Sequence, residues 1–369
     1  MRLALVVAGG VDRSAREHVT PALLWLIERL SARHQVAVFV LRYHDHPCTY
    51  HLLGATVHDL GSPRGLFGQY SALVSAMRRH GPFDIAHGYL ALPSGLSAAL
   101  AGRRLGIPSI VTFDSGEFVA LPDVGGGYGL QLRTRHRLAV ASAARLAWRV
   151  TVCSSYQERL ARAHGVAATV VPIGVDTGRF PPPPERIDGP PWRLLHVASQ
   201  NPVKDHTTLL HAVRLLASRS LDVHLDLVGE DTLGGATASL AERLALQTRV
   251  TFHGFQPTDA LAEMYQRAHL FVLSSRHEAA CVSVLEAAAS GLPAVGTRVG
   301  YLADWSPERA IAVAPGDPTT LADEVARLIA DAPKRARLAA AAREWTLAHD
   351  ADWTARQFAR MYQGLPVGS

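Results

Sequence analysis

The sequence of 369 residues is poor in cysteine, in lysine and in long apolar runs. Its three cysteines, Cys48, Cys153 and Cys281, are odd in number and far apart. This argues against a disulfide framework and a structural zinc site, and favours a reducing, cytoplasmic compartment. No apolar run approaches the roughly 20 residues that a membrane-spanning helix needs. The apolar start, Leu3–Ala8, is shorter than a signal-peptide core. We therefore expect a cytoplasmic protein whose first β-strand is Leu3–Ala8.

Lysine is rare: only Lys204 and Lys334 occur among the 37 basic residues. Residues 1–180 contain 19 arginines against 11 acidic residues, whereas residues 181–369 contain 18 basic against 21 acidic residues. A basic first half indicates an acidic partner, either a nucleic acid, a membrane surface or a phosphorylated substrate, or it serves solubility alone. No nucleic-acid recognition motif is present, so we do not expect nucleic acid as the partner.

Short apolar runs alternate with helical patterns along almost the whole chain. This alternation predicts an α/β fold in which helices cover both faces of parallel sheets. The expected strands are Leu3–Ala8, Val36–Leu41, Ile85–His87, Ser109–Phe113, Arg149–Cys153, Arg193–Ser199, Val223–Val228, Val250–His253, Leu270–Leu273 and Pro293–Thr297.

A proline-rich break lies near the middle of the chain. Four consecutive prolines, Pro181–Pro184, are followed by Gly189, Pro190 and Pro191. Such a run fits neither a helix nor a central strand. We therefore place a linker at 180–191, between one domain at 1–180 and a second at 181–349, followed by a helical segment from 350 to the end.

The segment from Ser274 to Pro293 carries the strongest chemical signal. It follows an apolar strand and opens a helix, with Glu278 at the turn and Glu286 about two helical turns later. The backbone N–H groups of Ala280, Cys281 and Val282 lie where a helix start would bind a diphosphate. Glu286 stands in an otherwise apolar helix, where a carboxylate is seldom buried without a partner. The alternative interpretation is that Glu278 is a charge at the helix start and Glu286 a solvated residue.

Five further motifs accompany this segment in order along the chain. They are Pro172–Phe180 (PIGVDTGRF), His196–Asp205 (HVASQNPVKD), Leu227–Glu230 (LVGE), Val250–Phe255 (VTFHGF) and Ala314–Pro318 (APGDP). Together with the Glu278/Glu286 pair, they resemble the motifs of the retaining GT-B glycosyltransferases of family 4, the group 1 glycosyl transferases. The resemblance extends over nearly the whole chain.

The resemblance implies two Rossmann-like domains that face each other across a central cleft. The N-terminal domain would bind the acceptor and the C-terminal domain the nucleotide-sugar donor, and the helical segment 350–369 would pack back on the N-terminal domain. It implies catalytic roles for Glu278, on the donor sugar, and for Lys204, on the diphosphate. Residues that would contact or border the donor are Glu286, Ala280, Cys281, Val282, Gly10, Gly229 and Phe255.

The implied reaction transfers a hexose from a UDP- or GDP-sugar to a hydroxyl, with the anomeric configuration kept. The acceptor would be a saccharide or a lipid-linked molecule, in the synthesis of cell-surface polysaccharide or glycolipid. The resemblance implies no cofactor and no metal ion.

The sequence departs from the family pattern at several positions. The family usually has an arginine a few residues before the lysine, where Ser199, Gln200 and Asn201 stand here. One cation of the diphosphate site is therefore missing, or another residue such as Arg276 supplies it. Many members carry a histidine where this chain has Asp114.

Acceptor contacts are expected from His87, Asp114 and Glu117. A structural role in the core is the alternative for His87.

Residues 130–149 form a basic, amphipathic stretch after the glycine-rich loop at 125–129. We expect one helix here. Its arginines could rest on an anionic membrane while the enzyme reaches a lipid-linked acceptor; a packed helix with solvated arginines is the alternative.

Three other functions compete with the transferase. A dinucleotide-dependent oxidoreductase would need the G-x-G-x-x-G spacing, which Gly9-Gly10 does not supply. A different GT-B enzyme, such as an epimerase or a phosphorylase, fits the Glu278/Glu286 pair less well. A catalytically degenerate partner subunit is compatible with the missing arginine.

Overall fold

The computed structural model describes residues 1–364; the last five residues of the expected C-terminal segment 350–369 lie outside the described part. The chain forms two compact units. The first contains Met1–Pro122, Gly127–Gly174 and the chain from Ala351, and the second contains Asp123–Gly126 and Val175–Asp350. The change of unit falls after Gly174, ahead of the expected boundary at 180. Residues 181–191 contain no helix or strand.

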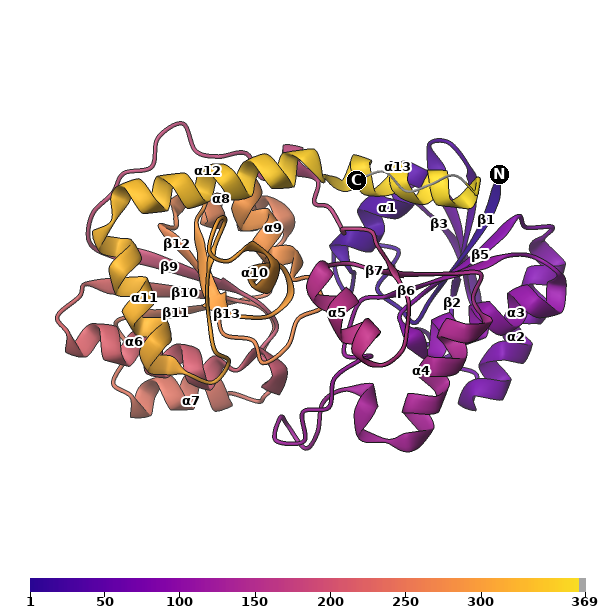
Figure 1. The fold of residues 1–369 in the computed structure, drawn as a ribbon, viewed down its shortest axis with the longest axis horizontal. Helices are drawn as coiled ribbons and strands as arrows, with labels where there is room; N and C mark the ends of the chain where they lie inside the picture. Colours follow the sequence, from indigo (N-terminus) through magenta and orange to yellow (C-terminus); the bar gives the residue numbers. More distant parts are fainter. Residues whose placement is uncertain (365–369) are drawn as a thin grey trace. The chain divides into compact units, whose positions relative to one another are not determined.

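The first unit is built on a sheet with the strand order β3-β4-β2-β1-β5-β6-β7-β8. Figure 1 labels β1, β2, β3, β5, β6 and β7 of this sheet. Neighbouring strands run parallel except β3 and β4, which are antiparallel. The strands are β1 (Arg2–Val7), β2 (Gln35–Val40), β3 (Cys48–Leu52), β4 (Ala55–Asp59), β5 (Ile85–Tyr89), β6 (Ser109–Phe113), β7 (Arg149–Val152) and β8 (Thr169–Val170).

Helices cover both faces of this sheet, because alternate residues of the buried strands point to opposite sides. Leu3 and Leu5 of β1 pack with α1 and α13, whereas Ala4 and Val6 of the same strand pack with α2 and α3. The helices are α1 (Pro21–Ser31), α2 (Gly65–His80), α3 (Leu96–Leu105), α4 (Thr134–Leu146), α5 (Ser155–Ala163) and α13 (Ala351–Tyr362), with short helical turns η1 (Ala91–Gly95) and η2 (Leu130–Leu132).

The second unit repeats this plan with a parallel sheet ordered β11-β10-β9-β12-β13-β14. Its strands are β9 (Trp192–Val197), β10 (Val223–Val228), β11 (Val250–Gly254), β12 (Leu270–Leu273), β13 (Ala294–Thr297) and β14 (Ile311–Val313). Its helices are α6 (His206–Ser218), α7 (Ala236–Arg243), α8 (Thr258–Arg267), α9 (Val282–Ala289), α10 (Gly300–Trp305), α11 (Pro318–Ala330) and α12 (Ala332–Ala348), with turns η3 (Thr177–Arg179) and η4 (Pro202–Lys204). The predicted α/β class and the two parallel-sheet domains are confirmed.

Each sheet has a point where the chain reverses its direction of travel across the strands. In the first sheet β1 has β2 on one side and β5 on the other, and in the second sheet β9 lies between β10 and β12. Open parallel sheets bind their ligands at such switch points, outside the carboxyl ends of the strands. The two places to search are therefore the loops after β1 and β5, and the loops after β9 and β12.

One expected helix was wrong in its extent. The stretch 130–149 is not continuous: η2 ends at Leu132, α4 spans Thr134–Leu146, and Arg149 already belongs to β7. β7 pairs with the interior strand β6, so the last residue of the expected helix, Arg149, belongs to the sheet.

Candidate functional site

Lys204 and Glu278 meet at the switch point of the second unit. Lys204 ends the turn η4 after β9, and Glu278 lies in the loop between β12 and α9. The Lys204 ammonium donates to Oε1 of Glu278 at 2.6 Å, and the Ser275 hydroxyl donates to the same oxygen at 2.6 Å. Both charged side chains are mostly buried, with 23% and 11% of their surfaces exposed. Two residues that the sequence singled out separately therefore form one ion pair.

The start of α9 is held in an unusual backbone conformation. Cys281 precedes the helix with a φ of +80°. Ala280 and Cys281 are buried, and the carbonyl of Ala280 accepts a hydrogen bond from the backbone N–H of Tyr301 at 3.0 Å. Burial raises the pKa of the Cys281 thiol to about 12. The thiol is therefore neutral and unsuited to act as a nucleophile.

Glu286 is buried in α9 and has the partner that its apolar surroundings require. Only 5% of the residue is exposed. The hydroxyl of Tyr265, on α8, donates to Oε2 of Glu286 at 2.7 Å. Burial raises the pKa of Glu286 to about 7, and the hydrogen bond from Tyr265 limits that rise. The sequence alone did not identify Tyr265, because nothing in it marks one helix as the neighbour of the other.

Gly229 and Phe255 follow the carboxyl ends of β10 and β11. Gly229 has a φ of +141°, and a β-carbon there would lie 2.0 Å from the carbonyl oxygen of Ala198. Only glycine fits this close approach of two loops. Phe255 is 53% exposed and offers a free aromatic surface.

Arg276 lies two residues before Glu278 and forms an ion pair. Its guanidinium contacts Oδ2 of Asp123 at 2.7 Å. Asp123 belongs to the short segment of the chain that is part of the second unit. The cation expected to replace the missing arginine is therefore balanced by a carboxylate that the sequence did not single out.

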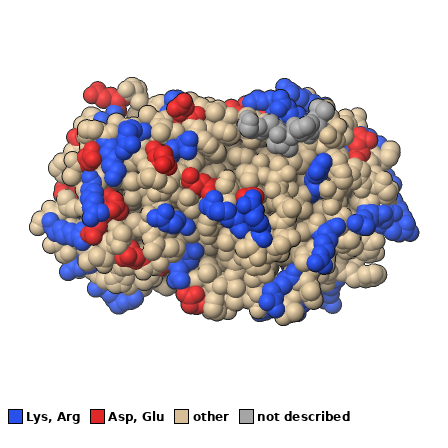
Figure 2. All heavy atoms as spheres, in the orientation of Figure 1, with Lys and Arg blue, Asp and Glu red and all other residues tan. Residues whose placement is uncertain are grey.

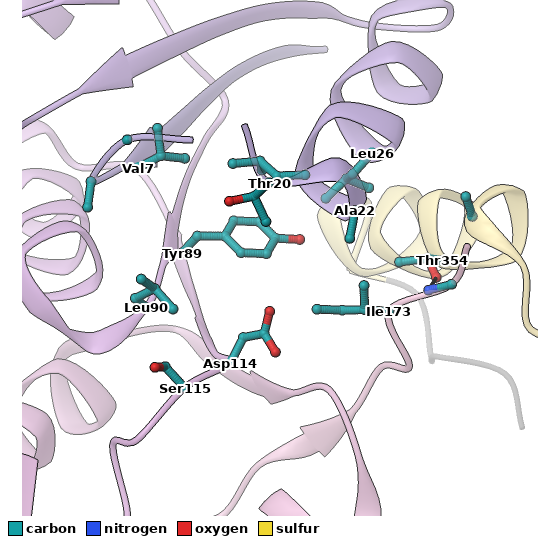
Figure 3. A pocket seen from close by; sticks show the side chains of 15 residues that line it. Val7, Thr20, Ala22, Leu26, Tyr89, Leu90, Asp114, Ser115, Ile173 and Thr354 are labelled. Atoms are coloured by element: carbon teal, nitrogen blue, oxygen red, sulfur yellow. Dashed lines mark hydrogen bonds between the residues drawn. The ribbon is translucent and has the colours of Figure 1, made fainter. Parts of the chain in front are cut away.

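The first unit contains a pocket of about 350 Å³ at its own switch point. Its wall includes the ends of β1 and β5 and the start of α1. Asp114, Thr20 and Tyr89 point into it (Figure 3). Asp114 is the expected acceptor residue that the structure places in this pocket.

Gly10 is not among the lining residues; its neighbour Gly9 is. Gly10 has a φ of +80°, and its carbonyl accepts from the backbone N–H of Thr20 at 2.9 Å. An added β-carbon would lie 2.5 Å from Oγ1 of Thr20. Gly10 thus closes the loop that carries the pocket wall.

His87 lies inside the core and not at the pocket. It is fully buried, its Nδ1 is 2.7 Å from the hydroxyl of Tyr362, and its Nε2 is 2.7 Å from Oγ1 of Thr112. Burial lowers its pKa to about 3, so the ring is neutral. The expected acceptor contact does not fit this position, and the alternative of a structural histidine does.

Glu117 is also buried, with 1% of the residue exposed. Its carboxylate accepts from the backbone N–H groups of Ala91 at 3.1 Å and Ser115 at 2.7 Å. Burial raises its pKa, and these hydrogen bonds oppose the rise. Glu117 therefore holds the loops after β5 and β6 together, and the expected contact with an acceptor does not fit its surroundings. A smaller cavity beside it is lined by Leu90 and Tyr128 among others.

The surface of α4 combines arginines with exposed apolar side chains. Leu138 is 65% exposed, and Trp148, just after the helix, is 43% exposed. Exposed arginines of this stretch are Arg133, Arg135, Arg137, Arg145 and Arg149. Figure 2 shows basic side chains gathered over the part of the first unit where Figure 1 places α4.

Within residues 1–364, no group of three or more His, Cys, Asp or Glu side chains is arranged to hold a metal ion. None of the helices in this part combines the length and the apolar composition that crossing a membrane requires.

Comparison with known families covers both units. Residues 22–179 match the family described as "Glycosyltransferase Family 4", and residues 181–345 match "Glycosyl transferases group 1". The MMP alpha-(1->4)-mannosyltransferase of Mycolicibacterium hassiacum is 30% identical over 73% of this chain and 67% of its own length. The chain belongs to the group 1 glycosyl transferases of family 4.

Other similarities are more distant or more partial. The D-inositol 3-phosphate glycosyltransferase of Corynebacterium urealyticum is 28% identical over 55% of this chain, and the alignment spans about half, 53%, of that relative. Sucrose-phosphate synthase from Thermosynechococcus elongatus has a TM-score of 0.83 at 20% identity, covering 99% of both chains. Anabaena HepE in complex with UDP and glucose has a TM-score of 0.75 at 18% identity, also covering 99% of both chains. The fold is that of the GT-B glycosyltransferases.

Proposed function

We propose that this family 4 protein is a retaining glycosyltransferase that moves a hexose from a UDP- or GDP-sugar to a hydroxyl acceptor. The observation that carries the proposal is the Lys204–Glu278 ion pair at the switch point of the second unit. A cation and a carboxylate held side by side suit a ligand that presents both phosphates and sugar hydroxyls. The complex of Anabaena HepE with UDP and glucose supports this choice of donor class.

In this proposal each charged side chain has a separate task. Lys204 binds the diphosphate and stabilises the negative charge that builds up as the nucleoside diphosphate leaves. Glu278 accepts hydrogen bonds from the hydroxyls of the donor sugar, and Glu286 accepts those of the ribose. Gly229 lets two loops approach closely, and Phe255 offers a face for the base.

The backbone N–H groups of Ala280, Cys281 and Val282 would complete the diphosphate site. We propose that the bond from the anomeric carbon to the phosphate breaks while the acceptor oxygen bonds to the same face of the sugar. The acceptor proton passes to the departing phosphate, so the reaction needs no protein nucleophile.

We also propose that the enzyme works at an anionic membrane surface, in the synthesis of cell-surface polysaccharide or glycolipid. Leu138 projects from α4 on a surface that is otherwise rich in arginine. Exposed apolar side chains flanked by arginines bind the boundary between headgroups and acyl chains. This is the first of the two interpretations that the sequence left open for residues 130–149.

The test of the donor site is a thermal-shift series with UDP, GDP, their sugars and NAD. A nucleotide at about 100 times its Kd adds about 2.7 kcal/mol of stability, which raises the melting temperature of a unit of this size by roughly 5–10 °C. We expect Lys204→Ala to abolish the response to UDP or GDP. Lys334→Ala, which replaces the other lysine of the chain on α12, is the matched control and should respond as the wild type does.

A response to NAD, or to no nucleotide at all, would overturn the proposed donor. Because Lys204→Ala removes the cation beside the carboxylate of Glu278 and leaves it the Ser275 hydroxyl, Glu278→Gln is measured alongside it. A wild-type nucleotide response without transfer to any hydroxyl would favour the degenerate partner subunit over the enzyme.

A further inference from the structure

The pocket of the first unit has an apolar wall with few polar groups. Eight of its fifteen lining residues are alanine, valine, leucine or isoleucine: Val7, Ala8, Ala22, Leu23, Leu26, Leu90, Ile173 and Ala351. Its volume of about 350 Å³ lies in the range of small-molecule sites, roughly 300–1,000 Å³. An apolar wall of this kind gains free energy when it covers an apolar surface of a ligand.

The polar part of the pocket has one sign of charge. Asp114 is the charged side chain among the fifteen lining residues, all of them in the described part of the chain, and no arginine, lysine or histidine accompanies it there. Tyr89 stays neutral, because burial raises its pKa well above the usual value. Thr354 already donates to the carbonyl of Pro172 at 2.7 Å and accepts from the backbone N–H of Gly174 at 2.9 Å.

From this lining we infer that the pocket binds the acceptor of the proposed transfer, and that this acceptor is an uncharged alcohol with an apolar body. That the bound molecule is an acceptor rests on the proposed function. A hydroxyl of such a molecule would donate to the carboxylate of Asp114, while its apolar part covers Leu23 and Leu26. A phosphorylated acceptor would lose its hydration without finding a cation, and would face a carboxylate of the same charge.

This assignment separates the chain from one of its relatives. The name of the Corynebacterium urealyticum relative contains a phosphorylated molecule, D-inositol 3-phosphate. The arginines that make residues 1–180 basic lie outside the lining of this pocket. The sequence left a phosphorylated substrate open as the partner of the basic half, and the pocket argues against that alternative for the acceptor.

The experiment measures direct binding of two probes, n-octyl β-D-glucoside below its micelle concentration and D-glucose 6-phosphate, by saturation-transfer NMR and calorimetry. We expect the octyl glucoside to bind at least tenfold more tightly than the sugar phosphate. Asp114→Asn should weaken the glucoside and should narrow the difference between the two probes. Ala22→Phe, which fills the pocket, should abolish binding of the glucoside, whereas Ala120→Phe, at an exposed position outside the pocket, should not.

The inference is overturned if glucose 6-phosphate binds as tightly as the glucoside, if the glucoside does not bind, or if Ala22→Phe leaves its binding unchanged. The nucleotide series with Lys204→Ala is run on the same preparations, because its residues belong to the second unit. If the protein binds a nucleotide but prefers the sugar phosphate to the glucoside, this inference alone is overturned. If the protein binds the glucoside but responds to no nucleotide, the proposed function is overturned. The inferred class of molecule bound by the pocket is then still supported.

Discussion

Replacing Glu286 by glutamine is expected to stabilise the second unit at neutral pH and to remove nucleotide binding. Burial raises the pKa of Glu286 from the ordinary 4.5 to about 7. Between these two values the folded protein binds more protons at this site than the unfolded chain does. The free energy of unfolding therefore falls as the pH rises from about 4.5 through 7.

The size of the effect follows from this difference in pKa. A difference of one in pKa corresponds to about 1.4 kcal/mol of folding free energy. The ionised carboxylate therefore destabilises the fold by about 3 kcal/mol above pH 7. Glutamine keeps an oxygen that can accept from Tyr265 and carries no charge. Relative to the wild type, Glu286→Gln should be nearly neutral at pH 4.5. At pH 8 it should be more stable by about 3 kcal/mol, or roughly 6–12 °C.

Calorimetric unfolding of both proteins between pH 4.5 and 8.5, with and without UDP or GDP, measures both halves of the prediction. Glu344→Gln, on the exposed side of α12, is the matched control and should change neither quantity. Parallel stability curves for the wild type and Glu286→Gln would refute the reasoning about burial. A nucleotide response that survives Glu286→Gln would refute the role on the ribose.

Three further predictions concern other parts of the chain. Gly229→Ala should destabilise the second unit by about 3 kcal/mol in denaturant unfolding, because its methyl group would meet a backbone oxygen. The control Gly234→Ala, whose methyl group meets nothing within 4 Å, should destabilise it by only about 1–2 kcal/mol. Equal effects of the two substitutions would contradict the steric argument. Glu117→Ala should lower the free energy of unfolding of the first unit by about 2–4 kcal/mol, because two backbone N–H groups lose their acceptor. It should also speed proteolysis in the loops after β5 and β6. An unchanged digestion rate would contradict this role of Glu117. Leu138→Ser should reduce co-sedimentation of the protein with anionic vesicles. The control is Leu347→Ser on α12 of the other unit, where the leucine is 42% exposed; it should not reduce co-sedimentation. Equal losses of co-sedimentation would argue against membrane binding by the α4 surface.

Local sequence predicted the central strands well. The expected ranges of β6, β10 and β12 agree with the structure residue for residue. β6 and β12 are short, mostly apolar runs that are buried on both faces, so their burial follows from composition. β10, with the sequence VHLDLV, alternates apolar with polar residues over its first four positions, which is the other pattern typical of a strand. The hairpin of β3 and β4 was missed, because Cys48–Leu52 is half exposed and mixes polar with apolar residues. Its strand character depends on antiparallel pairing at the edge of the sheet, which composition does not reveal.

The site shows the same limit. Motif and spacing singled out Lys204 and Glu278, but only the fold shows that their side chains bond to each other. His87 looked like a residue at the end of a strand, available to a ligand. The partners of its two ring nitrogens, Thr112 and Tyr362, are 25 and 275 residues away. A side chain whose hydrogen bonds are satisfied by distant segments cannot be told from a free one in a single sequence.

The charge of the chain is distributed unevenly between its two switch points. In the second unit the cation Lys204 pairs with the carboxylate of Glu278, whereas in the first unit the pocket presents the carboxylate of Asp114 without a basic side chain in its lining. The excess of arginine in residues 1–180 is therefore not explained by that pocket. Exposed arginines on and beside α4 lie around Leu138, an apolar side chain that solubility alone would not favour. Under the proposed function, the five exposed arginines of this surface account for part of the excess, because a membrane that carries the acceptor would supply both the negative charge and the apolar contact.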